Sequence, residues 1–558
     1  MTTLQHLKAA SSRYDVAALL NFKPSALTYV LFKLTDKQKY TEFDIKKKSG
    51  GVRQITAPTG QLKTLQRNLS RLLYECRAEI EAARGLKPIS HGFRRGHSII
   101  TNAKPHKNRR YVLNLDLENF FPTLNFGRVR GYFLKNNDFE LHETVATTIA
   151  QIACFKNTLP QGSPCSPIIS DLIAHLLDVR LVQLCKAHKC TYTRYADDLT
   201  ISTNQKAFPE ALAFRADTPG SEWIVGDQLK QVIINASFSI NATKTRMQCA
   251  PSRQMVTGLT VNDKVNIQSD YYRRARSMCS AFFSTGKYHS GDPSSVTTSI
   301  AKIEGILNHV HHVKDLSDQR SSNEKRDDQI AARALYSKLL FFRNFVLLDH
   351  PLVMCEGATD SIYLRQAIRF LPAFQPKLAE KSQKSIKLKV RFFKYSALTD
   401  NVMRLGGGTG GVRNFISHYA ELMAKYKFAP LLHPVIVLID NDDGAKEIFS
   451  LVNKKFNAGA GLLSTAQFYH LCNNLYLIKT PEGNGKSCIE DCFDSAVTMT
   501  KLGNKIFNPS NKINAATEYG KNHFAEYVVI PKAAKIDFSK FSTVLDRIVA
   551  VIDHYKPP

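Results

Sequence analysis

The chain has 558 residues, of which 76 are Lys or Arg and 48 are Asp or Glu, so its formal net charge is +28. Hydrophobic residues make up 43% and charged residues 22%, a balance that excludes a disordered chain and predicts several packed domains. The basic excess runs through both halves and favours a polyanionic partner, with nucleic acid first. A soluble basic protein without such a partner would have the same composition.

No targeting or membrane-spanning segment is evident. The N-terminal stretch Met1–Phe22 mixes charged residues into its apolar ones, which does not fit a signal peptide. Nowhere do 18 apolar residues run together. The 11 cysteines form no CxxC pair, so we expect buried thiols in a reducing cytosol. The sequence therefore predicts a cytoplasmic protein that is not inserted in a membrane.

Periodic apolar residues divide the chain into a mixed α and β part followed by an α/β part. In chain order, the predicted elements are helices within residues 1–50, a helix at Leu62–Ala83, a strand at Tyr111–Leu117, a strand pair at Tyr192–Tyr195 and Leu199–Ser202, helices from Tyr271 to Leu348, a strand at Leu352–Met354, a helix at Asp360–Phe370 and a strand at Val435–Ile439. The polar run 314–328 is predicted as a mobile loop within the helical stretch. We place the domain boundary near 345–351.

Three aspartates fall at strand ends in the first part. Asp116 ends an apolar strand, and Asp197 and Asp198 form the tip of a tight hairpin. Carboxylates so placed would hold two Mg²⁺ ions about 3.5–4 Å apart, an arrangement that activates a 3′-hydroxyl and stabilises a leaving pyrophosphate. Adjacent carboxylates repel each other, so an Asp-Asp pair at a hairpin tip is costly unless cations neutralise it. The alternative interpretation of an isolated pair is a solvated acidic turn.

The residues around these aspartates resemble the ordered motifs of reverse transcriptases. Tyr195-Ala196-Asp197-Asp198 resembles the YxDD box of that family, and Leu115–Phe121 resembles its first aspartate motif. The other matching segments are Arg53–Pro58 (the fingers motif), Leu159–Pro167 (PQGxxxSP), Asn241–Thr245 (the lysine motif), Asn102–His106 (the NAxxH element of retron reverse transcriptases) and Val256–Gly258 (their VTG element). The resemblance covers roughly residues 15–345 and narrows the family to retron reverse transcriptases.

This resemblance implies an α+β right-hand polymerase over residues 1–345, with fingers and palm to about 265 and a thumb over about 266–345. Asp116, Asp197 and Asp198 would be its catalytic and metal-binding residues, with two Mg²⁺ ions. Its partners would be dNTPs, a cognate structured non-coding RNA and the branched multicopy single-stranded DNA (msDNA) primed from a 2′-hydroxyl of that RNA. Such proteins are bacterial, so the expected location is the bacterial cytoplasm. Self-association is left open.

The resemblance also implies a nucleotide-binding set and an RNA-binding set. The nucleotide-binding set is Arg53, Phe121, Gln161, Gly162 and Lys244. In the RNA-binding set, the resemblance supplies Asn102, His106, Val256, Thr257 and Gly258. Arg273 and Arg274 are added because they fall on a predicted helix beside Tyr271 and Tyr272, where phosphate contacts with interleaved aromatic rings suit RNA. The ring of Phe121 would clash with a 2′-hydroxyl and select dNTPs, whereas the alternative is a core phenylalanine. For His106 the alternative is a structural histidine, and for Arg273 and Arg274 it is a solvated helix face.

A second group of carboxylates lies in the α/β part. Glu356 follows the strand at 352–354, and Asp440 and Asp442 follow the strand at 435–439. The carboxyl ends of parallel strands converge on one edge of a sheet, and such oxygen ligands suit Mg²⁺. Two unrelated strand-end turns are the alternative.

This second pattern resembles the TOPRIM domain of topoisomerases, primases and overcoming-lysogenisation-defect nucleases. Glu356-Gly357 with Asp360 resembles its glutamate motif, Asp440-x-Asp442 resembles its DxD motif, and a glycine-rich segment at 405–411 lies between them. The resemblance implies an α/β domain with a mainly parallel sheet over residues 350–558. Glu356, Asp440 and Asp442 would be catalytic and would hold one or two Mg²⁺ ions, with Glu490 or Asp491 as candidate further ligands.

The leading hypothesis is an RNA-directed DNA polymerase that makes msDNA and is fused to a TOPRIM nuclease effector in anti-phage defence. Two alternatives stay open: a polymerase–nuclease for nucleic-acid maintenance without a toxic role, and an RNA-binding scaffold with inactive sites. Six carboxylates in motif positions disfavour the scaffold. The nuclease substrate, whether DNA, messenger RNA or transfer RNA, and the activating trigger are also left open.

Overall fold

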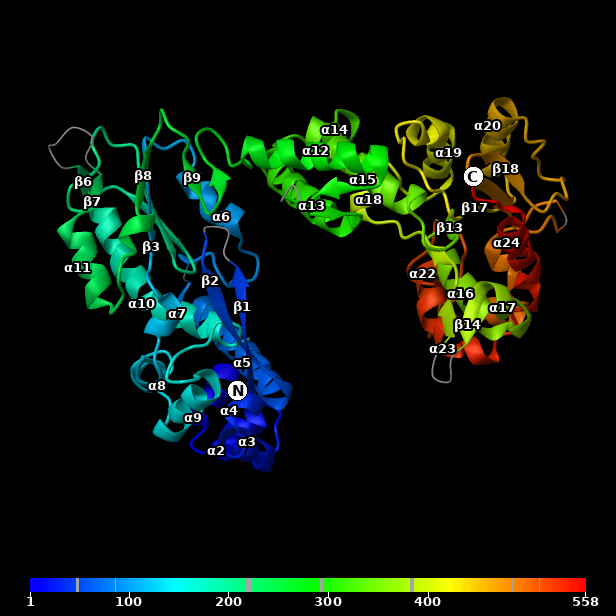
Figure 1. Ribbon diagram of the computed structural model, residues 1–558. Helices are drawn as coiled ribbons and strands as arrows, with labels where there is room; N and C mark the ends of the chain where they lie inside the picture. The colour runs from blue at the N-terminus through cyan, green and yellow to red at the C-terminus, as the bar shows by residue number, and fades with distance from the viewer. Residues whose placement is uncertain are drawn as a thin grey trace. The chain divides into compact units, whose positions relative to one another are not determined.

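The chain forms two compact units, Met1–Gln268 and Ser269–Pro558, which are drawn in the computed structural model of Figure 1. The structure describes residues 1–46, 50–85, 87–215, 222–291, 295–381, 386–483, 485–510 and 512–558. Over these ranges, none of the helices combines the length and apolar character needed to cross a membrane.

The centre of the first unit is a four-stranded antiparallel sheet in the order β4-β5-β3-β8. Its strands are β3 (Tyr111–Asp116), β4 (Thr191–Tyr195), β5 (Asp198–Thr203) and β8 (Arg246–Cys249). Leu113, Leu115, Leu199 and Ile201 are buried in one core, so the apolar residues bury this sheet against the helices. The strand predicted at 111–117 and the strand pair around Asp197 are confirmed.

Helices cover this sheet and carry the rest of the first core. The long helix α5 (Gly60–Arg84) buries Leu65, Leu69, Leu72 and Leu73, which confirms the predicted helix there. The other elements of the unit are α1 (Thr3–Ala9), α2 (Arg13–Leu19), α3 (Pro24–Phe32), α4 (Asp36–Lys39), β1 (Tyr40–Lys46), β2 (Val52–Pro58), α6 (Ile99–Ala103), α7 (Phe120–Thr123), α8 (Phe126–Lys135), α9 (Glu143–Ala153), α10 (Ser166–Ala187), β6 (Ala213–Arg215), β7 (Trp223–Val225), α11 (Asp227–Asn235), β9 (Met255–Val256) and β10 (Leu259–Thr260).

The second unit contains a five-stranded sheet in the order β16-β13-β17-β19-β18. The strands β16 (Arg391–Phe392), β13 (Leu352–Cys355), β17 (Val435–Ile439) and β19 (Leu475–Lys479) are parallel, and β18 (Tyr469–Cys472) is antiparallel to β19. All of β17 is buried, as expected for a strand covered on both faces.

Successive residues of the central strands alternate between two hydrophobic cores, one on each face of the sheet. Val435 and Val437 join the core with α19 (Thr409–Met423) and α20 (Ala445–Phe456). Ile436 and Leu438 join the core with α16 (Asp360–Phe370) and α24 (Ser542–His554). The remaining elements of this part are α17 (Gln375–Leu378), β14 (Ala379–Lys381), β15 (Ile386–Leu388), α18 (Ala397–Met403), α21 (Ser495–Thr498), β20 (Ile506–Phe507), β21 (Glu518–Tyr519), α22 (Lys521–His523) and α23 (Ile530–Lys532).

The helices that follow Gln268 pack with the α/β part of the chain. They are α12 (Ser269–Thr285), α13 (Ile300–Ser317), α14 (Ser322–Asp327) and α15 (Ala331–Phe341), with the short strands β11 (Tyr288–His289) and β12 (Val296–Thr297). Phe342 lies in one hydrophobic core with Tyr426 and the strand residues of the sheet. The chain therefore divides at 268/269, near the predicted start of the thumb at 266, whereas the sequence pattern places a boundary near 345–351.

The polar run at 314–328 is largely helical, contrary to the loop predicted there. Its charged side chains are satisfied by one another: Arg320 pairs with Asp318 and with Asp328, each at 2.9 Å. Ser321 and Glu324 form a capping box that starts α14. Asp318, Arg320 and Asp328 lie outside the two helices, so their ion pairs hold the link between α13 and α14 to the end of α14, while the capping box starts α14.

Candidate active sites

Three carboxylates meet at one end of the first sheet. Asp116 is the register partner of Asp198 across β3 and β5, and the N–H of Leu117 donates to the Asp197 carbonyl at 3.0 Å. Desolvation raises the pKa of Asp198 to about 7, with repulsion from Asp197 and Asp116 adding to it. Desolvation also raises the pKa of Asp197. The cluster is electrostatically strained without a cation.

A lysine ammonium already lies on this cluster. Nζ of Lys244 donates to both carboxylate oxygens of Asp116, at 2.9 and 3.0 Å. Within the described ranges, no group of three or more His, Cys, Asp or Glu side chains has the geometry of a formed metal site. The mutual repulsion of hard oxygen donors nevertheless fits a divalent cation such as Mg²⁺. The residues present are chemically suited to that ion.

A cavity of about 780 Å³ opens over these aspartates. It is lined by Asp116, Asp197 and all five residues of the predicted nucleotide-binding set, Arg53, Phe121, Gln161, Gly162 and Lys244. The structure thus brings together residues that are up to 191 positions apart in the sequence.

Gly162 is held where only glycine fits. The Thr56 N–H donates to the Gln161 carbonyl at 2.7 Å, which fixes the loop against β2. Gly162 has a φ of +127°, and a Cβ there would lie 2.8 Å from the Thr56 carbonyl oxygen. The backbone can therefore approach the cavity closely at this point because no side chain intervenes.

Both polar side chains that the NAxxH element contributes to the predicted RNA-binding set, Asn102 and His106, are completely buried. His106 is 0% exposed, and its ring nitrogens are 2.7 Å from the Ser202 hydroxyl and 2.8 Å from the Thr193 hydroxyl. Burial lowers the pKa of His106 to about 3, so the ring is neutral. Asn102 is also 0% exposed. Neither side chain reaches solvent. For His106 this is the arrangement expected of a structural histidine, which was the alternative to an RNA contact.

The other members of that set are distributed over both units. Thr257 donates from its hydroxyl to the Ile99 carbonyl at 3.3 Å, so the VTG segment packs on the helix that carries Asn102. Val256 is buried, and Gly258 has a φ of +84°. Arg273 and Arg274 are exposed on α12 in the second unit, and their contact with RNA remains a prediction.

A basic cleft beside the hairpin of Asp197 and Asp198 was not anticipated from the sequence. It has a volume of about 530 Å³ and is lined by α5, by the loop at 91–97 and by Tyr195. Arg67, Arg71 and Arg95 are exposed in it and form no ion pair within the described part of the chain. Phe93 lines both this cleft and the cavity over the aspartates. The i, i+4 spacing of Arg67 and Arg71 was the available signal.

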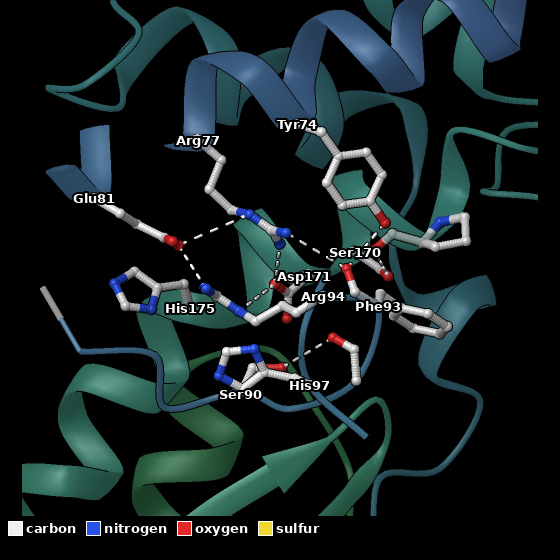
Figure 2. A network of polar contacts seen from close by, with 12 residues as sticks. Tyr74, Arg77, Glu81, Ser90, Phe93, Arg94, His97, Ser170, Asp171 and His175 are labelled. Carbon is white, nitrogen blue, oxygen red and sulfur yellow. Dashed lines mark hydrogen bonds and ion pairs between the residues drawn. The ribbon is translucent and has the colours of Figure 1, made fainter. Parts of the chain in front are cut away.

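A buried ionic network holds the wall of this cleft (Figure 2). Asp171 accepts from Arg77 at 2.6 Å and from Arg194 at 2.9 Å and lies 3.4 Å from Arg94. Arg94 also pairs with Glu81 at 2.7 Å. One buried carboxylate therefore ties α5, the loop at 91–97 and β4 to α10.

The loop at 91–97 also packs directly on the hairpin that carries Asp197 and Asp198. A Cβ at Gly92 would lie 2.5 Å from the Ala196 nitrogen, and the His91 N–H donates to the Arg194 carbonyl at 2.7 Å. Burial, with repulsion from His97 and Arg94, lowers the pKa of His91 to about 4. The arginines of the cleft rather than His91 supply its positive charge.

The second group of carboxylates lies at the carboxyl ends of the neighbouring parallel strands β13 and β17. The Asp440 N–H donates to Oε2 of Glu356 at 3.4 Å, and the Thr409 hydroxyl donates to Oε1 at 2.6 Å. Thr409 belongs to the glycine-rich segment, whose Gly408 N–H donates to the Glu356 carbonyl at 3.0 Å. Glu356 and Asp440 therefore lie at the same edge of the sheet, and the glycine-rich segment contacts Glu356 there.

Acidic side chains are crowded at this edge of the sheet. Burial raises the pKa of Asp440 to about 8, with added repulsion from Asp360 and Glu490. Burial likewise raises the pKa of Asp360 to about 6. Glu490 is 3% exposed; its Oε2 accepts from Lys521 at 3.0 Å, and its Oε1 has no hydrogen-bond partner among the residues that the structure describes. An unpartnered buried carboxylate oxygen fits a cation ligand.

The remaining acidic candidates are placed differently. Asp442 accepts from the Ala445 N–H at 3.2 Å at the start of α20 and is exposed. Asp491 accepts from the Cys488 N–H at 2.7 Å and so caps its own turn. A cavity of about 660 Å³ is lined by Glu356, Asp360 and Asp440. Asp360 was part of the glutamate motif in the sequence but was not among the predicted metal-binding residues.

Comparisons with known proteins agree with the geometry of the first unit. Residues 45–267 match the family model described as reverse transcriptase (RNA-dependent DNA polymerase). The retron Mx65 reverse transcriptase of Myxococcus xanthus is 30% identical over 332 residues, covering 56% of this chain and 70% of that protein. The retron Ec86 reverse transcriptase of Escherichia coli is 28% identical over 317 residues, covering 56% and 88%.

Two solved telomerases were also found. The Candida albicans telomerase, in complex with a fragment of telomeric RNA, gives a TM-score of 0.30 at 10% identity, covering 60% of this chain and 64% of that one. The apo Candida tropicalis telomerase gives 0.29 at 13% identity, covering 54% and 60%. The match spans less than two thirds of the length of either telomerase chain.

Proposed function

The chain belongs to the retron reverse transcriptases, and we propose that it is an RNA-directed DNA polymerase that makes msDNA from a cognate structured RNA. The observation that carries this proposal is the single cavity that holds Asp116, Asp197 and the predicted nucleotide-binding set. Its dimensions suit a nucleoside triphosphate at the end of a primer.

The charged residues at the cavity and the backbone at Gly162 each have a chemical role in this proposal. Bound Mg²⁺ would neutralise the growing charge and orient the reacting oxygens, held by Asp116, Asp197 and Asp198. Arg53 and Lys244 would bind triphosphate oxygens through charge-assisted hydrogen bonds. The backbone at Gly162 would lie against the incoming nucleotide.

Phe121→Ala is expected to relax discrimination between dNTPs and rNTPs. The ring of Phe121 lines the cavity and is braced by the rings of Phe93 and Phe120, with centroids 6.2 and 5.5 Å away. Removing it opens space for a 2′-hydroxyl. Primer extension with each nucleotide type measures the ratio of kcat/KM, and a ratio unchanged from wild type would show that Phe121 is only a packing residue.

We place the template strand in the basic cleft beside the hairpin. The three arginines without ion pairs suit a phosphate backbone, and Tyr74, Phe93 and Tyr195 offer rings to bases. Phe93 connects the cleft to the nucleotide cavity, so a strand in the cleft would lead directly to the reacting end.

Arg67→Ala with Arg71→Ala is expected to lower the affinity for the RNA template and to make that affinity less dependent on salt concentration. Losing two phosphate contacts should reduce the slope of log K against log salt by roughly 1.4. Fluorescence anisotropy at several salt concentrations measures this slope. The control is Lys206→Ala with Lys230→Ala, which removes two exposed charges of the same unit outside the cleft. Equal slopes in both variants would exclude the cleft as a template site.

For the second unit we propose a TOPRIM-like, metal-dependent nuclease that acts as the effector of anti-phage defence. Two features support it: Glu356 and Asp440 at adjacent parallel strand ends, and the unpartnered Oε1 of Glu490 beside them. Glu356, Asp440 and Asp442 would hold one or two Mg²⁺ ions, with Glu490 and Asp360 as further oxygen donors. The ions would supply an activated water for phosphodiester hydrolysis.

Isolating the nucleic acid that copurifies with the chain tests the polymerase proposal. The protein is expressed together with the DNA upstream of its gene, and the bound nucleic acid is sequenced and treated with ribonuclease and deoxyribonuclease separately. We expect one RNA joined covalently to one single-stranded DNA. RNA alone would contradict msDNA synthesis and would favour an RNA-binding scaffold. Phage plating of the same strain separates a defensive effector from a maintenance nuclease.

A further inference from the structure

A second, smaller cavity adjoins the acidic cavity of the second unit. It has a volume of about 460 Å³ and is formed by the segments around Leu502–Lys505, Ile513–Tyr519 and His523–Tyr527. Glu356, Asp360 and Asp440 line the larger of these two adjoining cavities, and Ile513 and His523 form part of the wall of both.

The wall of the small cavity is formed by two aromatic rings at i and i+4. The rings of His523 and Tyr527 have centroids 5.7 Å apart at an interplanar angle of 32°. The opposite side of the same helical turn is buried through Phe524 and Val528. Tyr527 is 53% exposed, so the packing of this turn does not require its ring.

The remaining walls are mostly apolar, with Lys505 and the carboxylate of Glu518 also lining the cavity, and further lysines lie on the adjoining segments. Ile513 is 42% exposed and covers one side, while the buried ring of Tyr519 contacts Phe507 at the floor. Lys505 lines the small cavity, and Lys521 lines the neighbouring cavity that contains Glu356, Asp360 and Asp440. Lys512, which lies between these two lysines in the sequence, is exposed. Stackable rings with lysines around them are the chemistry that single-stranded nucleic acid requires.

We propose that this cavity is a nucleobase subsite, which holds an unpaired base of a nucleic-acid strand whose phosphodiester lies at the acidic cavity. The proposal rests on the nuclease function proposed for the second unit and specifies its substrate class. A base would stack on His523 and Tyr527 while its own phosphate reaches the carboxylates. A base inside a duplex is stacked and paired, so the substrate is single-stranded or has an extruded base.

Stacking on rings also predicts how the site discriminates between sequences. Every base has a π face, so stacking tolerates any sequence and its loss costs a similar factor for each base. The preference is therefore for an unpaired base and not for a particular one. An abasic residue at the same position of the strand removes the interaction without altering the phosphates.

Photocrosslinking tests the subsite directly. The full chain is mixed with a single-stranded 12-mer oligonucleotide bearing one 5-iodouracil, with Ca²⁺ replacing Mg²⁺, irradiated and mapped by mass spectrometry. We expect a crosslink within residues 513–527. Tyr527→Ala should lower its yield roughly tenfold, whereas Tyr527→Phe, which keeps the ring, should retain it. The same oligonucleotide in a blunt duplex should give no crosslink in this segment.

The outcomes separate this subsite from the nuclease proposal. A crosslink that depends on the Tyr527 ring, without cleavage by wild type in Mg²⁺, supports the subsite and contradicts the nuclease. Cleavage of the normal and abasic strands at equal rates, with no crosslink at 513–527, supports the nuclease and overturns the subsite. Self-association that Tyr527→Ala abolishes, with no crosslink, would also overturn it, because the rings would then serve an interface between copies.

Discussion

Replacing Asp197 and Asp198 together by alanine is expected to abolish DNA synthesis by the chain. Desolvation, with repulsion from Asp197, raises the pKa of Asp198, and the two carboxylates would share the cations that stabilise the transition state. Metal ions of this kind supply several kcal/mol, so primer extension on an RNA template should fall by at least about a thousandfold. Because the pair repels itself without a cation, its removal should not destabilise the sheet.

The control for this experiment is Asp263→Ala, which removes an exposed carboxylate of the same unit outside the cavity. We expect it to extend primers at the wild-type rate. Thermal unfolding followed by circular dichroism should give all three proteins the same midpoint within a few degrees. If the double variant extended primers at a rate comparable with the control, Asp197 and Asp198 would not be catalytic residues.

Glu356→Ala is expected to remove nuclease activity from the second unit without affecting DNA synthesis. Glu356 accepts from Thr409 and Asp440, so it connects the glycine-rich segment to the end of β17 as well as offering oxygens to a cation. Loss of the cation would cost several kcal/mol in hydrolysis. Cleavage of a labelled single-stranded oligonucleotide in Mg²⁺ is the measurement.

Asp443→Ala is the matched control for that variant. Asp443 is next to Asp442 but pairs with Lys446 and Lys486, at 2.9 and 2.6 Å, and it does not line the acidic cavity. It should leave cleavage unchanged. If the defence proposal is right, strains with Glu356→Ala should contain normal msDNA and lose phage protection, while strains with Asp443→Ala keep both. Protection by Glu356→Ala with msDNA intact would exclude this site as the effector.

The strands and the carboxylates they carry could be predicted because their signals are local in the sequence. A short apolar run ending in Asp specifies both β17 and the position of Asp440 at its end, and the same holds for β3 and Asp116. The convergence of Glu356 and Asp440 followed from the general rule that parallel strand ends share an edge. No long-range contact had to be known.

The basic cleft and the burial of His106 could not be predicted in the same way. The cleft is assembled from α5 and the loop at 91–97, which are held by Asp171 from α10, and no periodic pattern connects these three segments. His106 is buried because Ser202 and Thr193 satisfy both ring nitrogens, and such partners appear only once the sheet is folded. Likewise, an apolar helix face does not reveal its partner, so Phe342 gave no sign of contacting Tyr426.

The central claim, that one chain carries two independent carboxylate sites with opposite actions on nucleic acid, is tested most directly by assaying both activities on both variants. Wild type, Asp197→Ala with Asp198→Ala, and Glu356→Ala are each given a primed RNA template with labelled dNTPs and, separately, a labelled single-stranded oligonucleotide. We predict that the double variant cleaves but does not polymerise, and that Glu356→Ala polymerises but does not cleave. Loss of both activities in either variant, or of neither, would contradict the claim.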